Sequence, residues 1–213
     1  MAVKASIFDK ILKDYCSEVA SIDFSSKSEF LGIRVTGKTI EIPFFTDTFT
    51  ITSQGVSDAK GKGPHHAVSV ILCKYLLLCP EAVTSTRELV TYKDFRDAAP
   101  LIGSFRDNVE KPICSHFSGK IEALETQCRN LGGHMADIGV SSQLSYEFRA
   151  LPQIPVYLLF NDRDEEFPAN ATILFERKTG DFLDMECVAM IGIWLSVKLT
   201  KPYFSHEDLQ KRN

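Results

Sequence analysis

The chain has 213 residues, of which 44% are hydrophobic and 24% charged, a composition typical of a globular protein long enough to bury a core. Its formal charge of -4 argues against a general nucleic-acid binder, which would present a basic face. Charged residues interrupt the N-terminal region, and the most apolar segment, 67–79, is too short to span a bilayer. We therefore expect a cytoplasmic protein whose partners include neither nucleic acid nor membrane.

The first third of the chain predicts a helix followed by a β-hairpin. Apolar residues recur at steps of three and four over 7–19, which indicates an amphipathic helix. Two alternating segments, 30–35 and 39–44, flank Gly37, a residue suited to a tight turn. The glycine-rich segment of about 53–64 is typical of a flexible loop and is the only candidate linker.

The middle of the chain is predicted to contain two helices. Residues 65–79 are apolar nearly all round, which is typical of a helix at the centre of a domain, and Pro80 ends it. A short connection leads to a loop over about 100–112. A second helix is predicted over 113–131, where Gly132 and Gly133 end it.

The last third predicts strands and one more helix. Residues 145–151 form one strand, and 156–160 and 171–175 form a hairpin. The final helix begins near Asp184, a suitable N-cap, and a polar tail follows over 202–213. Together the elements indicate one α+β domain over 1–213, with a mainly antiparallel sheet packed by about four helices.

The cysteines predict packed, reduced thiols. Six are spread along the chain: Cys16, Cys73, Cys79, Cys114, Cys128 and Cys187. None belongs to a C-x-x-C pair, and most fall on apolar helical faces. The spacing does not match a zinc site.

The loop of the last hairpin, 161–170, is the first candidate site. Its carboxylates are Asp162, Asp164, Glu165 and Glu166. Phe167 follows them, and we expect it to pin the loop against the protein. We also expect Asp184 and Glu186 to approach the same end of the hairpin. A pinned carboxylate cluster coordinates a hard cation, receives a basic partner or holds a carboxyl group with a raised pKa. A solvated hairpin tip is the alternative.

A second candidate site is the loop 131–139, which carries His134 and Asp137 beside two glycines that allow close backbone approach. A simple helix cap is the alternative here. Standard signatures fail: the segment Gly55 to Lys62 lacks the spacing of a phosphate-binding loop, and His65-His66 has no partner at helical spacing for a metal.

Short segments spread over nearly the whole chain carry a resemblance: Tyr75-Leu76-Leu77, Tyr92-Lys93-Asp94-Phe95, Leu131-Gly132-Gly133 with Asp137, Leu151-Pro152 with Pro155, and above all Asp164-Glu165-Glu166-Phe167-Pro168-Ala169 followed by Leu174-Phe175-Glu176. With these segments the chain resembles an uncharacterised prokaryotic domain-of-unknown-function family, found mostly in anaerobes. The family pattern has aspartate where this chain has Glu176. Some relatives carry a four-cysteine iron–sulfur domain like that of corrinoid proteins, and this chain has no such array. The resemblance therefore implies a corrinoid or divalent-metal cofactor by association only.

Three functions follow as hypotheses. The first is a cytoplasmic small-molecule-binding or accessory protein of anaerobic metabolism, associated with corrinoid or one-carbon chemistry. Its expected ligand-binding residues are Asp164, Glu165, Glu166, Phe167, His134 and Asp137. The second is an enzyme in which Glu165 or Glu166 acts as general acid or base, with or without a divalent metal. The third is a protein-interaction module with an acidic hairpin tip.

Overall fold

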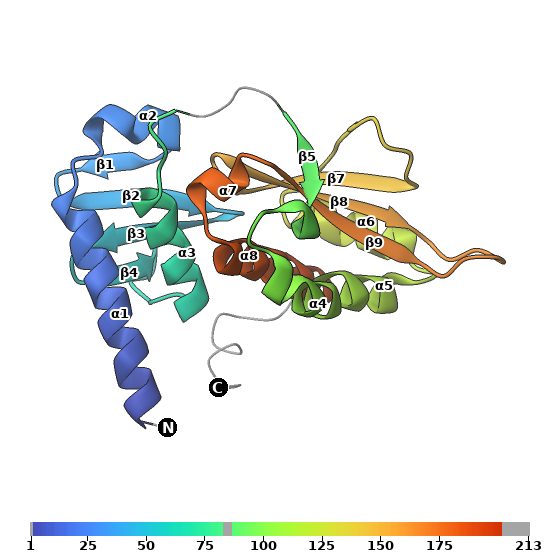
Figure 1. Cartoon of the computed structure of the whole chain (residues 1–213), viewed down its shortest axis with the longest axis horizontal. Helices are drawn as coiled ribbons and strands as arrows, with labels where there is room; N and C mark the ends of the chain where they lie inside the picture. The colour runs from blue at the N-terminus through green and yellow to red at the C-terminus, as the bar shows by residue number, and fades with distance from the viewer. Residues whose placement is uncertain (1, 83–86, 202–213) are drawn as a thin grey trace.

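A computed structural model describes residues 2–82 and 87–201, with side chains from residue 7 onward. The predicted α+β class is confirmed, but the strands form two antiparallel sheets rather than one (Figure 1). Each sheet packs helices against one face, and the two sheets lie side by side along the long axis of the molecule. More helices than the predicted four surround them.

The first sheet is four-stranded, with its strands in sequence order. They are β1 (Arg34–Thr36), β2 (Thr39–Phe44), β3 (Asp47–Thr52) and β4 (Gly55–Asp58). Helices α1 (Ala2–Ser21) and α3 (His66–Leu77) pack against it and against each other. The predicted loop over 53–64 is therefore wrong in part, since β4 pairs with β3 there. The predicted stripe of α1 is buried only from Cys16 onward, because Ile7 and Ile11 are exposed.

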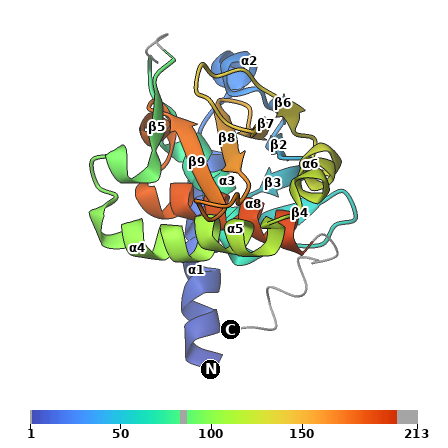
Figure 2. The same ribbon diagram turned by 90° about the vertical axis from the view of Figure 1, so that its right-hand side faces the viewer.

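The second sheet is five-stranded, in the order β5-β9-β8-β7-β6. Its strands are β5 (Leu89–Thr91), β6 (His134–Met135), β7 (Leu144–Leu151), β8 (Ile154–Asn161) and β9 (Asn170–Glu176). The strands predicted in the last third of the chain are confirmed. One face of this sheet is covered by helices, most directly by α8 (Met185–Thr200) (Figure 2). The N-cap predicted at Asp184 is confirmed, since its Oδ1 accepts from Cys187 N at 2.9 Å.

The helical region of residues 99–130 differs from the prediction in two places. It consists of α4 (Ile102–Phe105), a π-helical turn (Arg106–Glu110), α5 (Lys111–Phe117) and α6 (Ile121–Asn130). The predicted loop over 100–112 is helical, and the wider π turn ends two residues before Pro112, which has no N–H to donate to the preceding turn. The predicted helix 113–131 breaks at Gly119, whose φ of 74° ends α5.

Short helical turns complete the described chain. They are the 3-10 turns Ser25–Lys27, Tyr92–Asp94 and Ala99–Leu101, and the helices α2 (Ser28–Leu31) and α7 (Thr179–Phe182). Within residues 2–82 and 87–201, no helix is both long and apolar enough to cross a bilayer. The polar tail predicted over 202–213 lies outside the described residues.

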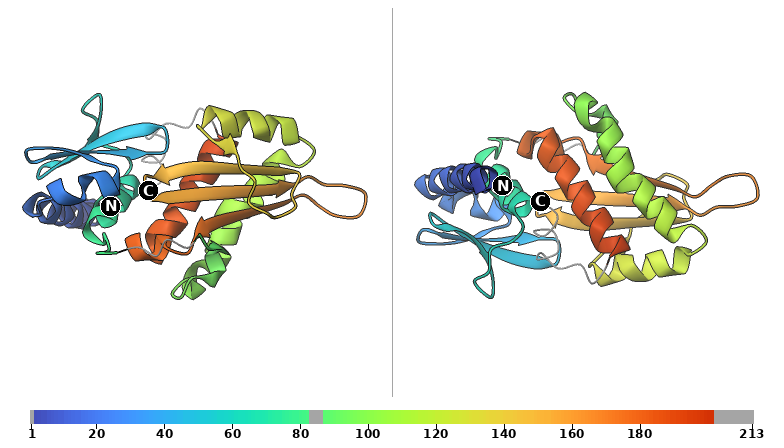
Figure 3. Two further views of the ribbon diagram at one scale, coloured as in Figure 1. Left: turned by 90° about the horizontal axis from the view of Figure 1, so that it is seen from above. Right: turned by 90° about the horizontal axis from the view of Figure 1, so that it is seen from below.

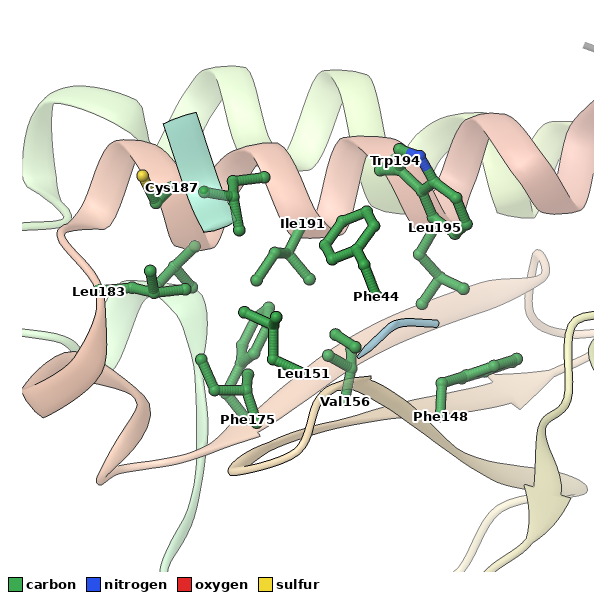
Figure 4. Packing of buried hydrophobic residues seen from close by; sticks show 14 of the residues in the cluster. Phe44, Phe148, Leu151, Val156, Phe175, Leu183, Cys187, Ile191, Trp194 and Leu195 are labelled. Atoms are coloured by element: carbon green, nitrogen blue, oxygen red, sulfur yellow. The ribbon is translucent and has the colours of Figure 1, made fainter. Parts of the chain in front are cut away.

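One hydrophobic core runs through both sheets. Phe44, at the end of β2, points between α8 and the five-stranded sheet, and its ring lies 5.2 Å from that of Trp194 (Figure 4). The next residue, Phe45, stacks on Trp194 at 4.2 Å, and its N–H donates to Ala150 O at 2.9 Å. This shared core supports the expected single domain over 1–213, which stays a prediction.

The cysteines pack as predicted. All six are free, and four of them are buried: Cys16, Cys73, Cys128 and Cys187. Burial raises the pKa of Cys128 to about 12. Such a thiol is a weak nucleophile at neutral pH and behaves as a small apolar side chain.

Candidate functional site

The acidic loop forms the exposed tip of the β8–β9 hairpin, which projects beyond the end of the sheet (Figures 1 and 3). Asp164 Oδ1 accepts from Phe167 N at 2.7 Å and from Glu166 N at 2.8 Å, and these donors lower the pKa of Asp164. The side chains of Glu165 and Glu166 form no hydrogen bond or ion pair with any residue the structure describes. The side chain of Phe167 is 66% exposed, so the expected apolar anchor is wrong.

Asp162, rather than Phe167, attaches the hairpin loop to the rest of the protein. Its Oδ1 accepts from Gly119 N at 2.6 Å and from Arg163 N at 2.7 Å. Its own N–H donates to Gln143 Oε1 at 2.7 Å. The base of the hairpin is thereby attached to the turn between α5 and α6 and to the loop that precedes β7.

Asp184 and Glu186 do not reach the acidic tip, so this expectation is also wrong. Both lie beyond the far end of β9, at the start of α8. The second carboxylate oxygen of Asp184 lies 3.5 Å from Lys74 Nζ of α3. The pair joins two helices and contributes nothing to the hairpin loop.

One face of the five-stranded sheet is covered by none of the described helices, and we call it the open face (Figure 3). His134 lies there beside Glu147, and Asp137 lies there beside Leu159 and Leu174. His134 pairs with Glu147 in the β6–β7 register, and its Nε2 lies 3.8 Å from Glu147 Oε2. Asp137 lines a hollow on this face. Within the described residues, no hydrogen bond or ion pair joins either side chain to the acidic tip. The two predicted candidate sites are therefore separate.

The alternation of side chains along β7 and β8 builds the open face. Tyr146 and Phe148 point to the helices and are buried, so Glu147 and Arg149 point the other way. The register then places Glu147 opposite Tyr157 of β8. The loop 136–143 crosses above these strands, as the left panel of Figure 3 shows.

Five charged side chains form a cluster on the open face. Glu176 pairs with Lys178 Nζ at 2.8 Å and with Arg87 Nε at 3.7 Å. Glu147 lies 3.6 Å from Arg149 Nη2 and 4.0 Å from Arg87 Nη2. The glutamate side chains are only 15% (Glu147) and 11% (Glu176) exposed, whereas that of Arg149 is 63% exposed. Two largely buried carboxylates are thus held by three cations.

Tyr157 lies at the centre of this cluster. Its hydroxyl donates to Glu176 Oε1 at 3.4 Å, and the guanidinium of Arg87 lies 5.1 Å from its ring centroid. Burial, and then the charge of Glu147, raises the pKa of Tyr157 to about 12. The phenol is therefore a neutral hydrogen-bonding group at physiological pH.

Two hollows adjoin each other on the open face, and Arg87 lines both. The polar hollow has a volume of about 340 Å³ and contains the charged cluster. The apolar hollow has a volume of about 620 Å³ and is lined by Leu89, Leu159, Leu174, Ile138 and Val140, with Asp137 at its edge. Together they provide a charged end and an apolar end for one ligand.

Sequence reasoning missed most of this cluster. Arg87, Glu147, Arg149, Tyr157 and Lys178 were not candidates, and Glu176 was noted only as a strand end. One usable signal was present, because Glu147 and Arg149 alternate with buried aromatic residues in β7. The other charged residues come from separate segments that only the sheet pairing brings together.

Metal-ligand geometry provides no further candidate. Among residues 2–82 and 87–201, no three histidine, cysteine, aspartate or glutamate side chains are arranged to hold a metal ion. The open face instead offers charged and aromatic groups suited to an organic ligand.

Comparison with known proteins identifies a family for nearly the whole chain. The family model described as Domain of unknown function (DUF3786) matches residues 23–197. This match includes both sheets, the open face and the hairpin tip. No curated protein and no solved structure matches the chain significantly.

Proposed function

We propose that this chain, which belongs to the DUF3786 family, is a small-molecule-binding protein whose ligand lies on the open face. The observation that carries the proposal is the cluster around Tyr157. Two largely buried carboxylates, Glu147 and Glu176, are held there beside an apolar hollow. Ligand sites are typically concave, mostly apolar and furnished with a few convergent polar groups.

The alternative of a purely structural ion-pair network is less favourable on energetic grounds. Exposed ion pairs contribute only about 0–1 kcal/mol, and burying a carboxylate has a desolvation cost that a loose pair does not repay. The contacts of Arg87, at 3.7 Å and 4.0 Å, are longer than a good charged hydrogen bond. Within the cluster the Glu176–Lys178 pair, at 2.8 Å, is well formed, whereas the Arg87 contacts and the Glu147–Arg149 pair at 3.6 Å are long. A ligand that completes the hydrogen bonds of the two arginines would therefore stabilise the cluster.

The metabolic context of this function is carried over from the family resemblance alone. The proposal places the protein in the cytoplasm and in anaerobic metabolism, with an association to corrinoid or one-carbon chemistry. Asp137 belongs to the proposed site because it lines the apolar hollow, and His134, which lines neither hollow, adjoins the site through its contact with Glu147. The residues Asp164, Glu165, Glu166 and Phe167 do not border either hollow.

The acidic tip supports a second candidate function, contact with a partner protein. The observation that favours this function is the exposure of Phe167, which is 66% exposed and follows Glu165 and Glu166 in the sequence. Exposed aromatic side chains next to charges are common in protein interfaces. By contrast, Glu165 and Glu166 are exposed, and no described residue forms a hydrogen bond or ion pair with their side chains, so nothing in the structure supports a role as general acid or base.

Native mass spectrometry of protein purified without oxygen tests the proposed function, with the denatured mass as reference. We expect a retained small molecule in the parent chain and its loss in an Arg87→Gln, Arg149→Gln double variant. A Glu165→Gln, Glu166→Gln double variant serves as the matched control and should retain it. The proposal would be contradicted if the arginine double variant retained the small molecule and the glutamate double variant lost it. The mass of the retained species would identify a corrinoid or a metal.

A further inference from the structure

The two hollows of the open face adjoin at Arg87, and we treat them as one groove with a polar end and an apolar end. It follows β8 from Pro155, which lines the polar hollow, to Leu159, which lines the apolar hollow. Four residues of strand span about 13 Å at about 3.3 Å per residue. Arg87 lies between the ends, since it lines both hollows.

The charges of the groove favour an anion at the polar end. There, Arg87, Arg149 and Lys178 outnumber Glu147 and Glu176, which leaves one net positive charge. Arg149 is the most exposed member of the cluster, and its Nη1 donates to Pro152 O at 3.0 Å. A guanidinium has five N–H donors in a fork that matches a carboxylate. The carboxylate of a ligand therefore finds N–H donors on Arg149 without displacing Glu147 or Glu176.

Asp137 favours one orientation of an anionic ligand, with its charged group away from the apolar hollow. It lines the apolar hollow, where it repels an anionic group, and its Oδ1 accepts from Gly139 N at 3.0 Å. The remaining lining there is mainly apolar: Leu159 and Leu174 form the floor, and Val140 on the crossing loop is 53% exposed. Leu159 and Leu174 are already packed against Ala136 and Ile138, so an apolar ligand body in this hollow would mainly remove the surface of Val140 from water.

From this polarity we infer that the ligand is an amphipathic carboxylate. Its head group binds at Arg149 and Lys178, and its apolar body lies in the apolar hollow, beside Ile138 and Val140 of the loop 136–143. A single negative charge matches the net charge of the polar hollow. The inference rests on the proposed function, because it names the ligand class of the same site.

Decanoate is the probe that tests this class, with decyltrimethylammonium as a cation of equal chain length and acetate as a head group without a chain. Isothermal titration of the parent chain below the micellar concentration gives the three dissociation constants. We expect decanoate to bind at least about tenfold more tightly than either comparator. Decyltrimethylammonium lacks the charged hydrogen bond of the carboxylate, and acetate lacks the apolar contact of the chain.

Three variants locate the binding. We expect Arg149→Gln to weaken decanoate about tenfold, and Val140→Asp to weaken it similarly by placing a charge at the apolar end. Arg34→Gln is the matched control, since Arg34 is an exposed arginine of the first sheet, and it should change nothing.

Two contrary results are distinguishable. If decyltrimethylammonium binds as tightly as decanoate and both are weakened by Val140→Asp alone, the carboxylate class is wrong and the groove remains the site. If neither amphiphile binds and the native mass shows no retained species, the proposed function fails as well.

Discussion

At the scale of single residues, the acidic side chains of the hairpin loop differ in whether they accept hydrogen bonds from the backbone. Asp162 accepts two backbone N–H groups, from Gly119 and from Arg163. The side chains of Glu165 and Glu166 extend into solvent and form no hydrogen bond or ion pair with the described residues. Carboxylates therefore stabilise this loop at its base, through Asp162, and within its tip, through Asp164, whereas those of Glu165 and Glu166 do not.

Replacement of these residues by alanine separates the two roles. We expect Asp162→Ala to lower the free energy of unfolding by about 1 kcal/mol, because the acceptor for two N–H groups is lost. Glu165→Ala and Glu166→Ala should each change it by less than about 0.5 kcal/mol, as exposed side chains do. Urea unfolding of the three variants measures this. A larger loss at Glu165 or Glu166 than at Asp162 would show that the tip is held by contacts absent from this structure.

At the scale of elements, the crossing of α4 and α8 depends on Gly192. A Cβ at this position would lie 2.6 Å from Cε2 of Phe105. Phe105 cannot move aside easily, because it is buried and stacks on Tyr92 with ring centroids 4.3 Å apart. The two helices approach closely only because position 192 has no side chain.

Gly192→Ala tests this close approach. Alanine gains about 1 kcal/mol of helix propensity over glycine, whereas overpacking costs about 1–3 kcal/mol. We expect net destabilisation and a lower midpoint of thermal unfolding. Gly103→Ala is the matched control, because its Cβ would meet nothing within 4 Å, and it should leave the midpoint equal or higher. Equal effects of the two changes would contradict the packing described.

Most elements could be predicted from periodicity, and the exceptions have physical causes. The strand β4 lies in a glycine-rich segment whose composition resembles a loop, and only its pairing with β3 makes it a strand. The π turn before Pro112 keeps the chain helical where proline and glycine suggested a loop. Gly119 ends α5 inside an apolar stripe that continues through α6, so the stripe concealed the break.

At the scale of the whole molecule, the site was harder to predict than the fold. The carboxylates of 162–166 were conspicuous in the sequence, but a run of charges at a hairpin tip is exposed by its position. The groove combines residues from Arg87 to Lys178, and no local pattern indicates which face of β8 lacks a helix. Glycines beside polar residues drew attention to His134 and Asp137, whereas no such pattern marked their neighbours on the open face, and the binding role of both residues stays a prediction.

The central claim is that a ligand binds on the open face and away from the acidic tip. Hydrogen exchange measured by mass spectrometry, with and without decanoate, tests this claim most directly, because loop amides exchange quickly unless they are covered. We expect decanoate to slow exchange in the loop 136–143 and to leave residues 162–169 unchanged. Slower exchange confined to 162–169, with the loop 136–143 unaffected, would contradict the claim.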